Sequence, residues 1–393
     1  MKRAKPHEDS IQAASKKMRS HGLSDIAIRA FETNVRRFWK NAESHWIRES
    51  EIAPLDPKDL IHLEDLEKKT AAELFSKTAI LKLNGGLGST MGLDGAKSLL
   101  EVKDGLTFLD IIVRQTLLLH QKHKARVRLI FMNSFNTSAQ TMEYLKKHYP
   151  ELAAEPDLEL LQNKVPKFHE ADHRPVEHPS DDDLEWCPPG HGDIYICLQH
   201  SGLLERLIGA GVLYLFVSNA DNLGATLSPR LLAHFASSGA PFLMEVAERT
   251  KSDQKGGHLA RAKSGKLILR ESVQCHEDDR KHFQDISRHR YFNTNNLWIN
   301  LDRLRDLLHE FEGLLPLPVI RNLKNVDPKN EASARVIQYE TAMGAAIELF
   351  EGAGAVVVPR ARFTPVKTNA DLELLRSDAY QLTEDFRLVA KKS

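Results

Sequence analysis

Short apolar runs alternate with longer amphipathic stretches along most of the chain. Runs of strand length lie at 79–81, 127–132, 212–217, 242–246 and 355–358. Between them, as at 109–120 and 227–237, apolar residues recur at helical spacing. Uninterrupted apolar strands that alternate with helices are typical of a parallel sheet with both faces covered. The pattern therefore predicts an α/β fold in which a mixed, mostly parallel sheet is flanked by helices.

The N-terminal part of the chain departs from this alternation. The first twenty or so residues are polar and mixed in charge, which predicts a frayed arm in which the basic cluster around Lys17 is solvated. Ser24 is a helix-capping signal, and apolar residues then recur at steps of three and four through 28–38, as in an amphipathic helix. We therefore predict an arm and helical segment over 1–75 that packs on a larger domain at 76–393.

Two further segments have the character of antiparallel strands. Residues 256–271 contain two strand-like runs separated by a turn, and 291–300 mix aromatic, amide and apolar residues. We expect both segments to form an excursion that covers one side of the parallel sheet.

Composition limits the kinds of ligand and compartment. The 393 residues carry 54 basic and 54 acidic side chains, so an anionic ligand must be bound by a local site, and wholesale nucleic-acid binding is disfavoured. No apolar segment follows the N-terminal lysines, so the sequence predicts neither a secretory signal nor a membrane anchor. The three cysteines, Cys187, Cys197 and Cys275, lack metal-site spacing. They are expected to be buried thiols in a cytoplasmic protein, where thiols stay reduced.

A glycine-rich loop follows the first apolar run. Gly85, Gly86 and Gly88 allow backbone N–H groups to approach a polyanion, and Lys97 supplies a positive charge. The loop is not a Walker A motif, because Ala96 separates the last glycine from the lysine. It also fails the dinucleotide-binding pattern. The loop alone is compatible with a phosphate-binding site or with a purely structural turn.

Ligands of open α/β sheets bind beyond the carboxyl ends of the strands, so the residues that follow each apolar run are candidates. Asp221 follows the run at 213–217 and has small neighbours. Mg²⁺ takes hard oxygen ligands and needs only one or two protein carboxylates when phosphates and water supply the rest. Asp221 is therefore our candidate metal ligand and Mg²⁺ the expected cofactor. An Asx turn is the structural alternative.

Two more strand ends carry groups suited to a nucleotide. Gln162 can donate to and accept from the edge of a pyrimidine, and Met132 ends another apolar run where it could face a base. His191 lies among two prolines and two glycines, which fix an irregular backbone suited to a ligand wall. A surface turn at Gln162 and an ordinary loop at His191 remain the alternatives.

Several isolated polar groups match a sugar phosphate. Lys255 precedes two glycines, Glu271 ends a strand-like run, and the amides of Asn293 and Asn295 could pair with sugar hydroxyls. Lys367 is a further isolated lysine near the C-terminus. Each is equally compatible with an ordinary polar turn or strand end. No serine, cysteine or histidine nucleophile lies beside an evident base.

These segments, taken together and in this order, resemble the eukaryotic-type UTP–glucose-1-phosphate uridylyltransferase family. The resemblance spans 79 to about 380 and rests on Leu-Asn-Gly-Gly-Leu-Gly with its lysine, Phe-Met-Asn-Ser-Phe, Trp-Cys-Pro-Pro-Gly-His-Gly-Asp, Ser-Asn-Ala-Asp-Asn-Leu-Gly-Ala, Phe-Asn-Thr-Asn-Asn-Leu-Trp, Glu-Thr-Ala-Met-Gly and Pro-Val-Lys-Thr. It implies a Rossmann-like nucleotidyltransferase core of the GT-A type over 76–393.

The resemblance also implies roles for individual residues. The nucleotide-binding set would be Leu83, Asn84, Gly85, Gly86, Lys97, Met132, Gln162, Gly190 and Lys367. The sugar-phosphate-binding set would be His191, Asn219, Ala220, Asp221, Lys255, Glu271, Asn293 and Asn295. Lys97, Lys367 and Asp221 would be the catalytic residues, and Asp221 would also bind Mg²⁺.

The reaction implied by the resemblance is reversible. A phosphate oxygen of glucose 1-phosphate attacks the α-phosphorus of UTP in line and expels pyrophosphate, with no covalent enzyme intermediate. This agrees with the lack of an evident nucleophile, since lysines and a metal supply positioning and charge neutralisation. A related enzyme for another hexose 1-phosphate, and a non-catalytic nucleotide-sugar binder, are the alternatives.

Two departures from the family pattern are evident. The loop reads Gly-Ala-Lys-Ser where the family usually has Gly-Pro-Lys-Ser, so it should be modestly looser without losing a ligand group. Family members also usually continue into a left-handed β-helix domain that mediates self-association, whereas this chain ends at Ser393. We therefore expect that domain to be absent and the protein to be a monomer or weak dimer.

Overall fold

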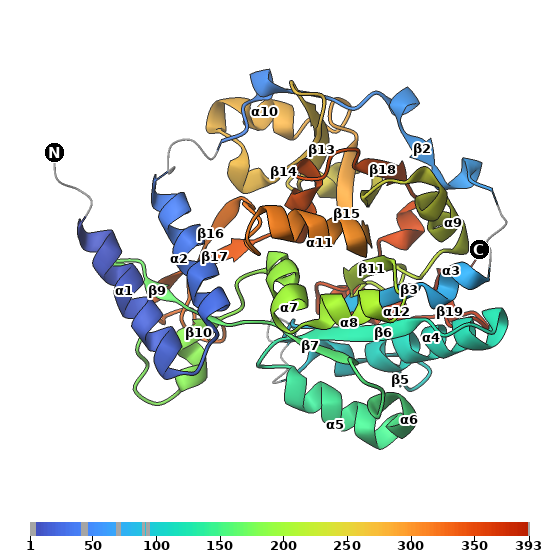
Figure 1. Ribbon diagram of the computed structural model, residues 1–393, viewed down its shortest axis with the longest axis horizontal. Coiled ribbons are helices and arrows are strands. Elements are labelled where there is room, and N and C mark those ends of the chain that lie inside the picture. The colour runs from blue at the N-terminus through green and yellow to red at the C-terminus, as the bar shows by residue number, and fades with distance from the viewer. Residues whose placement is uncertain (1–4, 41–45, 68–71, 89–90, 92–94, 392–393) are drawn as a thin grey trace.

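One large sheet runs through the molecule (Figure 1). The computed structural model describes residues 5–40, 46–67, 72–88, 91 and 95–391. In these residues the main sheet has eleven strands. Its main path runs in the order β2 (Ile61–His62), β18 (Gly354–Val357), β12 (Phe242–Glu248), β15 (Tyr291–Asn300), β11 (Tyr214–Asn219), β3 (Thr78–Leu83), β6 (Arg128–Asn133) and β7 (Glu159–Leu161).

The strand directions confirm the predicted α/β fold with a mixed, mostly parallel sheet. Strand β11 is parallel to β3, β3 to β6, and β6 to β7, while β2, β18 and β12 form a second parallel group. The antiparallel strand β15 joins the two groups. Because the parallel strands share a direction, the carboxyl ends of β3, β6 and β11 meet at one edge, where a ligand site is expected.

The position predicted for 291–300 was wrong, although its antiparallel direction was right. Strand β15 lies in the middle of the sheet and does not cover one side of it. Leu297 and Trp298 are fully buried in the hydrophobic layers on opposite faces of the sheet, so both sides of the strand are covered. The other predicted excursion is the hairpin of β13 (His258–Ala262) and β14 (Leu267–Arg270), which extends the main sheet through β15 and the short strand β1 (Ile52–Ala53).

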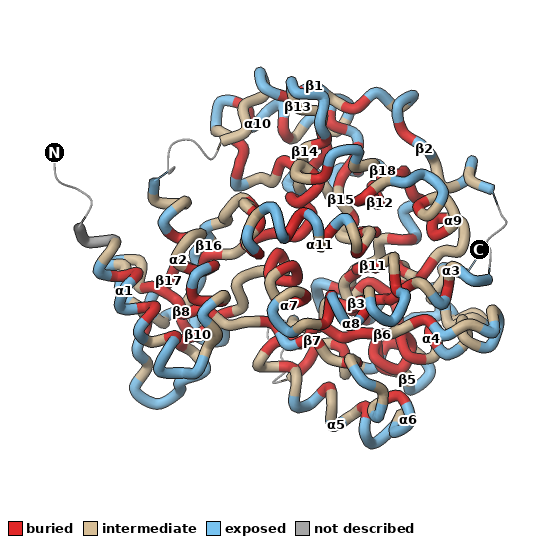
Figure 2. Tube along the Cα trace, in the orientation of Figure 1, coloured by how far each residue is buried: buried red, intermediate tan, exposed pale blue. Residues whose placement is uncertain are grey.

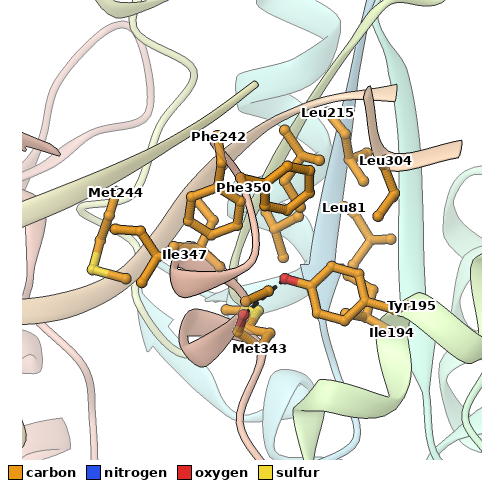
Figure 3. Close-up of a cluster of buried hydrophobic side chains, with 14 of the residues drawn as sticks. Leu81, Ile194, Tyr195, Leu215, Phe242, Met244, Leu304, Met343, Ile347 and Phe350 are labelled. Carbon is orange, nitrogen blue, oxygen red and sulfur yellow. Dashed lines mark hydrogen bonds between the residues drawn. The ribbon is translucent and has the colours of Figure 1, made fainter. Parts of the chain in front are cut away.

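Helices cover both faces of the sheet. The face that carries Leu81 and Leu215 packs against α7 (Ile194–His200), α8 (Leu203–Gly209), α11 (Leu301–Glu310) and the 3₁₀ helix η11 (Met343–Glu348). The opposite face, with Ile80 and Phe216, packs against α3 (Glu73–Ser76), α4 (Phe108–His123), α5 (Ser138–His148), α6 (Pro150–Ala153), α9 (Pro229–Ser238) and α12 (Asn369–Arg376). Buried residues follow the central strands (Figure 2), and Figure 3 shows part of the first layer.

Local sequence accounts for where these helices begin. Thr107 caps α4 through its side-chain oxygen, which accepts from the Asp110 amide, while the Asp110 carboxylate accepts from the Thr107 amide. Helix α9 begins with Ser228 as cap and Pro229 in the first turn, and Gly239 ends it in the left-handed region. Such caps determine the residue at which each helix begins after the preceding strand.

The predicted frayed arm is a helix. Helix α1 (Lys5–Ser20) packs beside α2 (Asp25–Lys40), the predicted amphipathic helix (Figure 1). Ile11, Ala14 and Met18 are buried, because their spacing places them on one face of the helix. The Lys17 side chain was predicted to be solvated, and this was wrong. It pairs with Glu185 and lies over a tryptophan ring.

Helices α1 and α2 pack against small sheets beside the main one. These sheets pair β8 (Val165–Pro166) with β10 (Trp186–Cys187), and β16 (Val319–Asn325) with β17 (Arg335–Thr341) and β9 (Phe168–His169). Apart from short 3₁₀ helices, the remaining described elements are α10 (Arg280–Phe283) and the hairpins of β4 (Glu101–Lys103) with β5 (Leu106–Thr107) and β19 (Tyr380–Leu382) with β20 (Leu388–Ala390). The domain division at residue 75 stays a prediction.

Two smaller expectations concern thiols and membranes. All three cysteines are free and buried, as predicted. Among the described residues, none of the helices is both long and apolar enough to cross a bilayer.

Candidate active site

A cavity of about 260 Å³ lies at the carboxyl ends of β3, β6 and β11. Its position is the one expected for a ligand site in an open α/β sheet. The cavity is lined by Leu83, Asn84, Gly85, Gly86, Lys97, Ser98, Met132, Gln162, Pro188, Gly190, His191, Asn219, Ala220 and Asp221. Most of the residues predicted for the nucleotide, and four of those predicted for the sugar phosphate, therefore border one cavity.

The first wall is the backbone that follows β3. The Asn84 side chain is buried and donates to Asn133 Oδ1 at 2.8 Å and to Thr141 Oγ1 at 3.1 Å. Thr137 Oγ1 donates to the Asn84 carbonyl at 2.8 Å, and Ser134 Oγ donates to the Gly85 carbonyl at 2.9 Å. These contacts hold the backbone from outside the cavity, so Asn84 serves the site through its main chain and its side chain is structural.

Gln162 connects this wall to a second one, the proline- and glycine-rich segment at 188–192. Its Nε2 donates to the Gly190 carbonyl at 2.8 Å. A Cβ atom on Gly85 would lie 3.1 Å from Gln162 Oε1, so the glycine lets the amide lie against the loop. Gly190 has φ of 83°, in the left-handed region, and a Cβ there would overlap the Thr341 backbone. Both glycines are therefore required by the close packing of the two walls.

Lys97 and Asp221 form an ion pair in the lining of the cavity. Lys97 Nζ donates to Asp221 Oδ2 at 2.6 Å, and the two side chains are 16% and 25% exposed. The lysine also donates to the carbonyl of Val366, whose own amide donates to the Asp221 carbonyl at 3.2 Å. The glycine-rich loop, the end of β11 and the segment at 363–368 thus meet at one ion pair.

His191 has a defined tautomer. The Met343 amide donates to His191 Nδ1 at 3.0 Å, so Nδ1 accepts and the proton is on Nε2. Met343 is held in turn by Tyr195, whose hydroxyl donates to the Met343 carbonyl at 2.7 Å (Figure 3). Burial lowers the pKa of His191 to about 4. The ring is therefore neutral at physiological pH and can offer Nε2–H as a hydrogen-bond donor.

The other predicted sugar-side residues do not line this cavity. Asn293 and Asn295 lie where β15 bulges against β12, and Asn293 Nδ2 donates to Asn295 Oδ1 at 2.9 Å. A Cβ on Gly344 would be 2.7 Å from Asn293 Nδ2, so this pair lies next to the segment that holds His191. Glu271 packs against Gly257, and burial raises its pKa. These residues do not line the cavity. The asparagine pair lies beside it and contacts the η11 segment.

Two predicted lysines are exposed. Lys255 lies in the loop between β12 and β13, and Lys367 follows Val366 at the margin of the site. Neither lines the cavity, so their predicted contacts with phosphate stay predictions.

Two lining residues were missed from the sequence. Pro188 was noted only as part of a rigid loop, and Ser98 was quoted within the loop motif without a role. The Ser98 hydroxyl is buried and makes no hydrogen bond within the described residues. Its position directly after Lys97 was the signal that could have identified it.

The protein oxygens at the site suit a metal ion that takes most of its ligands from phosphates and water. In the part of the chain that the structure describes, no three histidine, cysteine or acidic side chains are grouped to hold a metal. Asp221 Oδ1 is buried and without a hydrogen-bond partner there. One carboxylate with an available oxygen suits Mg²⁺ that is otherwise bound by phosphates and water.

Comparison with known proteins decides the family. A model of the family described as UTP–glucose-1-phosphate uridylyltransferase matches residues 28–393. The chain belongs to this family. A probable UTP–glucose-1-phosphate uridylyltransferase of Schizosaccharomyces pombe is 43% identical over 311 residues, 79% of this chain and 60% of that protein. The Saccharomyces cerevisiae uridylyltransferase is 38% identical over 380 residues, 94% of this chain and 75% of the yeast protein.

Solved uridylyltransferase-family structures have the same fold. The Trypanosoma brucei UDP-glucose phosphorylase matches with a TM-score of 0.90 and 46% identity, covering 98% of this chain and 82% of that one. A mutant Leishmania major UDP-glucose pyrophosphorylase in complex with UDP-glucose matches with a TM-score of 0.89 and 49% identity, over 97% and 82% of the two chains. This chain spans 60% and 63% of the S. pombe and Encephalitozoon cuniculi relatives.

Proposed function

We propose that this chain is a magnesium-dependent uridylyltransferase that forms UDP-glucose and pyrophosphate from UTP and glucose 1-phosphate, reversibly. The observation that carries the proposal is the Lys97–Asp221 ion pair at 2.6 Å, which lines the same cavity as Gly85, Gly86 and Gln162. A cation and a carboxylate beside open backbone N–H groups can bind a polyphosphate and its metal together. The family match and the UDP-glucose complex of a relative support the same substrate.

The cavity offers each part of UTP a matching group. Gln162 uses one Nε2 hydrogen on Gly190, which leaves its amide edge to face a uracil lying against Gly85 and Met132. The backbone at 84–86 and the Lys97 ammonium would receive the phosphates. We assign Lys367 to the phosphates as well, since Val366 already contacts both members of the ion pair.

Binding UTP requires Lys97 to exchange partners. Its ammonium is held by Asp221 and by the Val366 carbonyl. A bound phosphate would take over the ammonium and release Asp221, with Mg²⁺ supplying Lewis-acid charge neutralisation between carboxylate and phosphates. The chain's own part is to hold two polyanions in line against their mutual repulsion, so that a phosphate oxygen reaches the α-phosphorus.

His191 and the β15 amides are assigned to the sugar phosphate. The neutral His191 ring can donate from Nε2 without changing its charge, because Met343 fixes its tautomer. We place Asn219, Ala220, Lys255, Glu271, Asn293 and Asn295 around the hexose and its phosphate. The partners are small molecules, and monomeric or weakly dimeric assembly and cytoplasmic location stay predictions.

A panel of sugar phosphates tests this function. Purified protein would be incubated with UTP, MgCl₂ and one of glucose 1-phosphate, galactose 1-phosphate or N-acetylglucosamine 1-phosphate, and pyrophosphate release would be measured. We expect the fastest release with glucose 1-phosphate and none when EDTA removes the metal, because the Lys97 ammonium alone leaves most of the phosphate charge uncompensated beside the Asp221 carboxylate. Faster release with another sugar would change the substrate, and no release with any sugar would reject the enzyme in favour of a nucleotide-sugar binder.

A further inference from the structure

The Lys97 loop is held by a side chain outside it. The Ala96 amide donates to Gln140 Oε1 on α5 at 2.9 Å. Ala96 itself is only 3% exposed, so its amide needs a protein partner. A Cβ on Gly95 would lie 2.6 Å from the same oxygen, so Gly95 permits the close approach. Gln140 thus contacts the backbone immediately before Lys97.

Two backbone hydrogen bonds join the two limbs of the loop to each other. Gly88 N donates to the Gly95 carbonyl at 3.1 Å, and Lys97 N donates to the Gly86 carbonyl at 3.2 Å. Neither bond attaches the second limb to the helix beside it. Helix α5 anchors the first limb, through the bond from its cap residue Thr137 to Asn84. Gln140 gives the second limb an anchor on the same helix.

The backbone at Ala96 suits proline. Its φ of −60° and ψ of 123° lie within the range that a proline ring imposes, near −65° in φ. Proline has no amide hydrogen and would place Cδ where the bond to Gln140 now runs. A proline would therefore fix the backbone by its ring and require the exposed Gln140 side chain to turn away. Proline at 96 and glutamine at 140 are alternative ways of fixing one conformation.

We propose that Gln140 is a positioning residue for Lys97, which through its bond to the Ala96 amide supplies the loop stiffness that proline would otherwise give. This inference rests on the proposed role of Lys97 in binding UTP. It predicts a stiffer loop than the expectation from the sequence, because the amide that alanine retains is used for an anchor.

A double-mutant cycle of Gln140→Ala and Ala96→Pro tests the proposal. We expect Gln140→Ala to lower kcat/KM for UTP by about threefold to tenfold, the range that one neutral hydrogen bond supplies. The KM for glucose 1-phosphate should not change, and the melting temperature should fall only slightly, because a single buried amide loses its partner. In the Ala96→Pro background, whose own activity should be near that of the unmodified protein, Gln140→Ala should cause a clearly smaller loss, because the bond to the Ala96 amide is already absent there. Glu143→Ala, at an exposed position of the same helix, is the matched control.

Two outcomes would overturn the proposal. Equal losses from Gln140→Ala in both backgrounds would show that the glutamine acts elsewhere, and no loss in the unmodified protein would show that its bond does not position Lys97. Hydrogen exchange separates this inference from the proposed function. Gln140→Ala should speed exchange of the Ala96 amide even in a protein without uridylyltransferase activity, and unchanged exchange would contradict the anchor directly.

Discussion

Replacing Lys97 by alanine is expected to lower the rate of UDP-glucose formation by about a hundredfold to a thousandfold, the usual cost of losing one preorganised electrostatic contact to a reacting group. The loss should be this large because Lys97 is the cation that faces Asp221 within the cavity, at 2.6 Å. Without it, the α-phosphorus would be approached by a second polyanion with less positive charge to offset the repulsion. The measurement is steady-state pyrophosphate release at saturating substrates.

The matched control is Lys146→Ala, which removes an exposed lysine of α5 outside the cavity. It should leave the rate unchanged. Melting temperatures of the two variants should agree, since Asp221 stays 25% exposed and partly hydrated when its partner is lost. A Lys97→Ala protein that kept more than a tenth of the rate would contradict the role assigned to this lysine.

Replacing Glu245 by alanine is expected to have the largest effect on stability. Glu245 lies on β12 and is 0% exposed. Arg362 donates to its Oε2 at 2.7 Å and to its Oε1 at 2.8 Å, and Trp298 Nε1 donates to Oε1 at 3.0 Å. Lys82 lies nearby, and burial, together with the Arg362 charge, lowers its pKa to about 7 while Glu245 acts in the opposite direction. One carboxylate therefore offsets the charge of a buried cationic cluster.

Removing that carboxylate leaves the buried guanidinium with no counter-charge and only the Thr226 carbonyl as a partner, and takes away the acceptor of the Trp298 indole. Breaking a buried pair in this way costs about 3–5 kcal/mol of unfolding free energy. Urea denaturation would measure the loss, with Glu248→Ala as the control, because Glu248 ends the same strand and pairs with Arg290 at an exposed position. The control should lose less than about 1 kcal/mol. Equal losses in the two variants would show that Glu245 does not hold the cluster together.

Loss of Glu245 would also affect the candidate active site. Arg362 donates to the Thr226 carbonyl, and the Arg362 carbonyl accepts from Asn222 Nδ2 at 3.1 Å. Asn222 follows Asp221 and also accepts from the Thr364 amide at 3.0 Å. The buried cluster thus supports the segment that brings Val366 to the ion pair.

Local pattern predicted the parallel strands well, because each is an apolar run that needs cover on both faces. It failed for β15, whose central place depends on pairing with β11 and β12, strands distant in sequence. It failed for α1 as well, since only three small or medium apolar residues mark its buried face, and besides α2 their partners lie beyond residue 164. Long-range pairing is not encoded in periodicity.

The candidate site shows the same difference between features set by local sequence, which could be predicted, and long-range contacts, which could not. Strand ends identified Gln162, Asp221 and the glycine-rich loop, since all parallel strands deliver their carboxyl ends to one edge. The contact between Ala96 and Gln140 could not be predicted, because it joins positions 44 residues apart and leaves no sequence signal. The structural role of the buried Asn84 side chain could not be predicted either, because it depends on partners distant in sequence.

The most direct test of where the substrates meet is a crystal structure of this chain with UDP-glucose. We expect uracil against Gly85 and Met132 with its edge on the Gln162 amide, the diphosphate at Lys97 with Asp221 released from its ion pair, and the hexose toward His191 and Asn293. UDP-glucose bound outside this cavity, or bound within it while the Lys97–Asp221 pair stays closed, would contradict the proposed site.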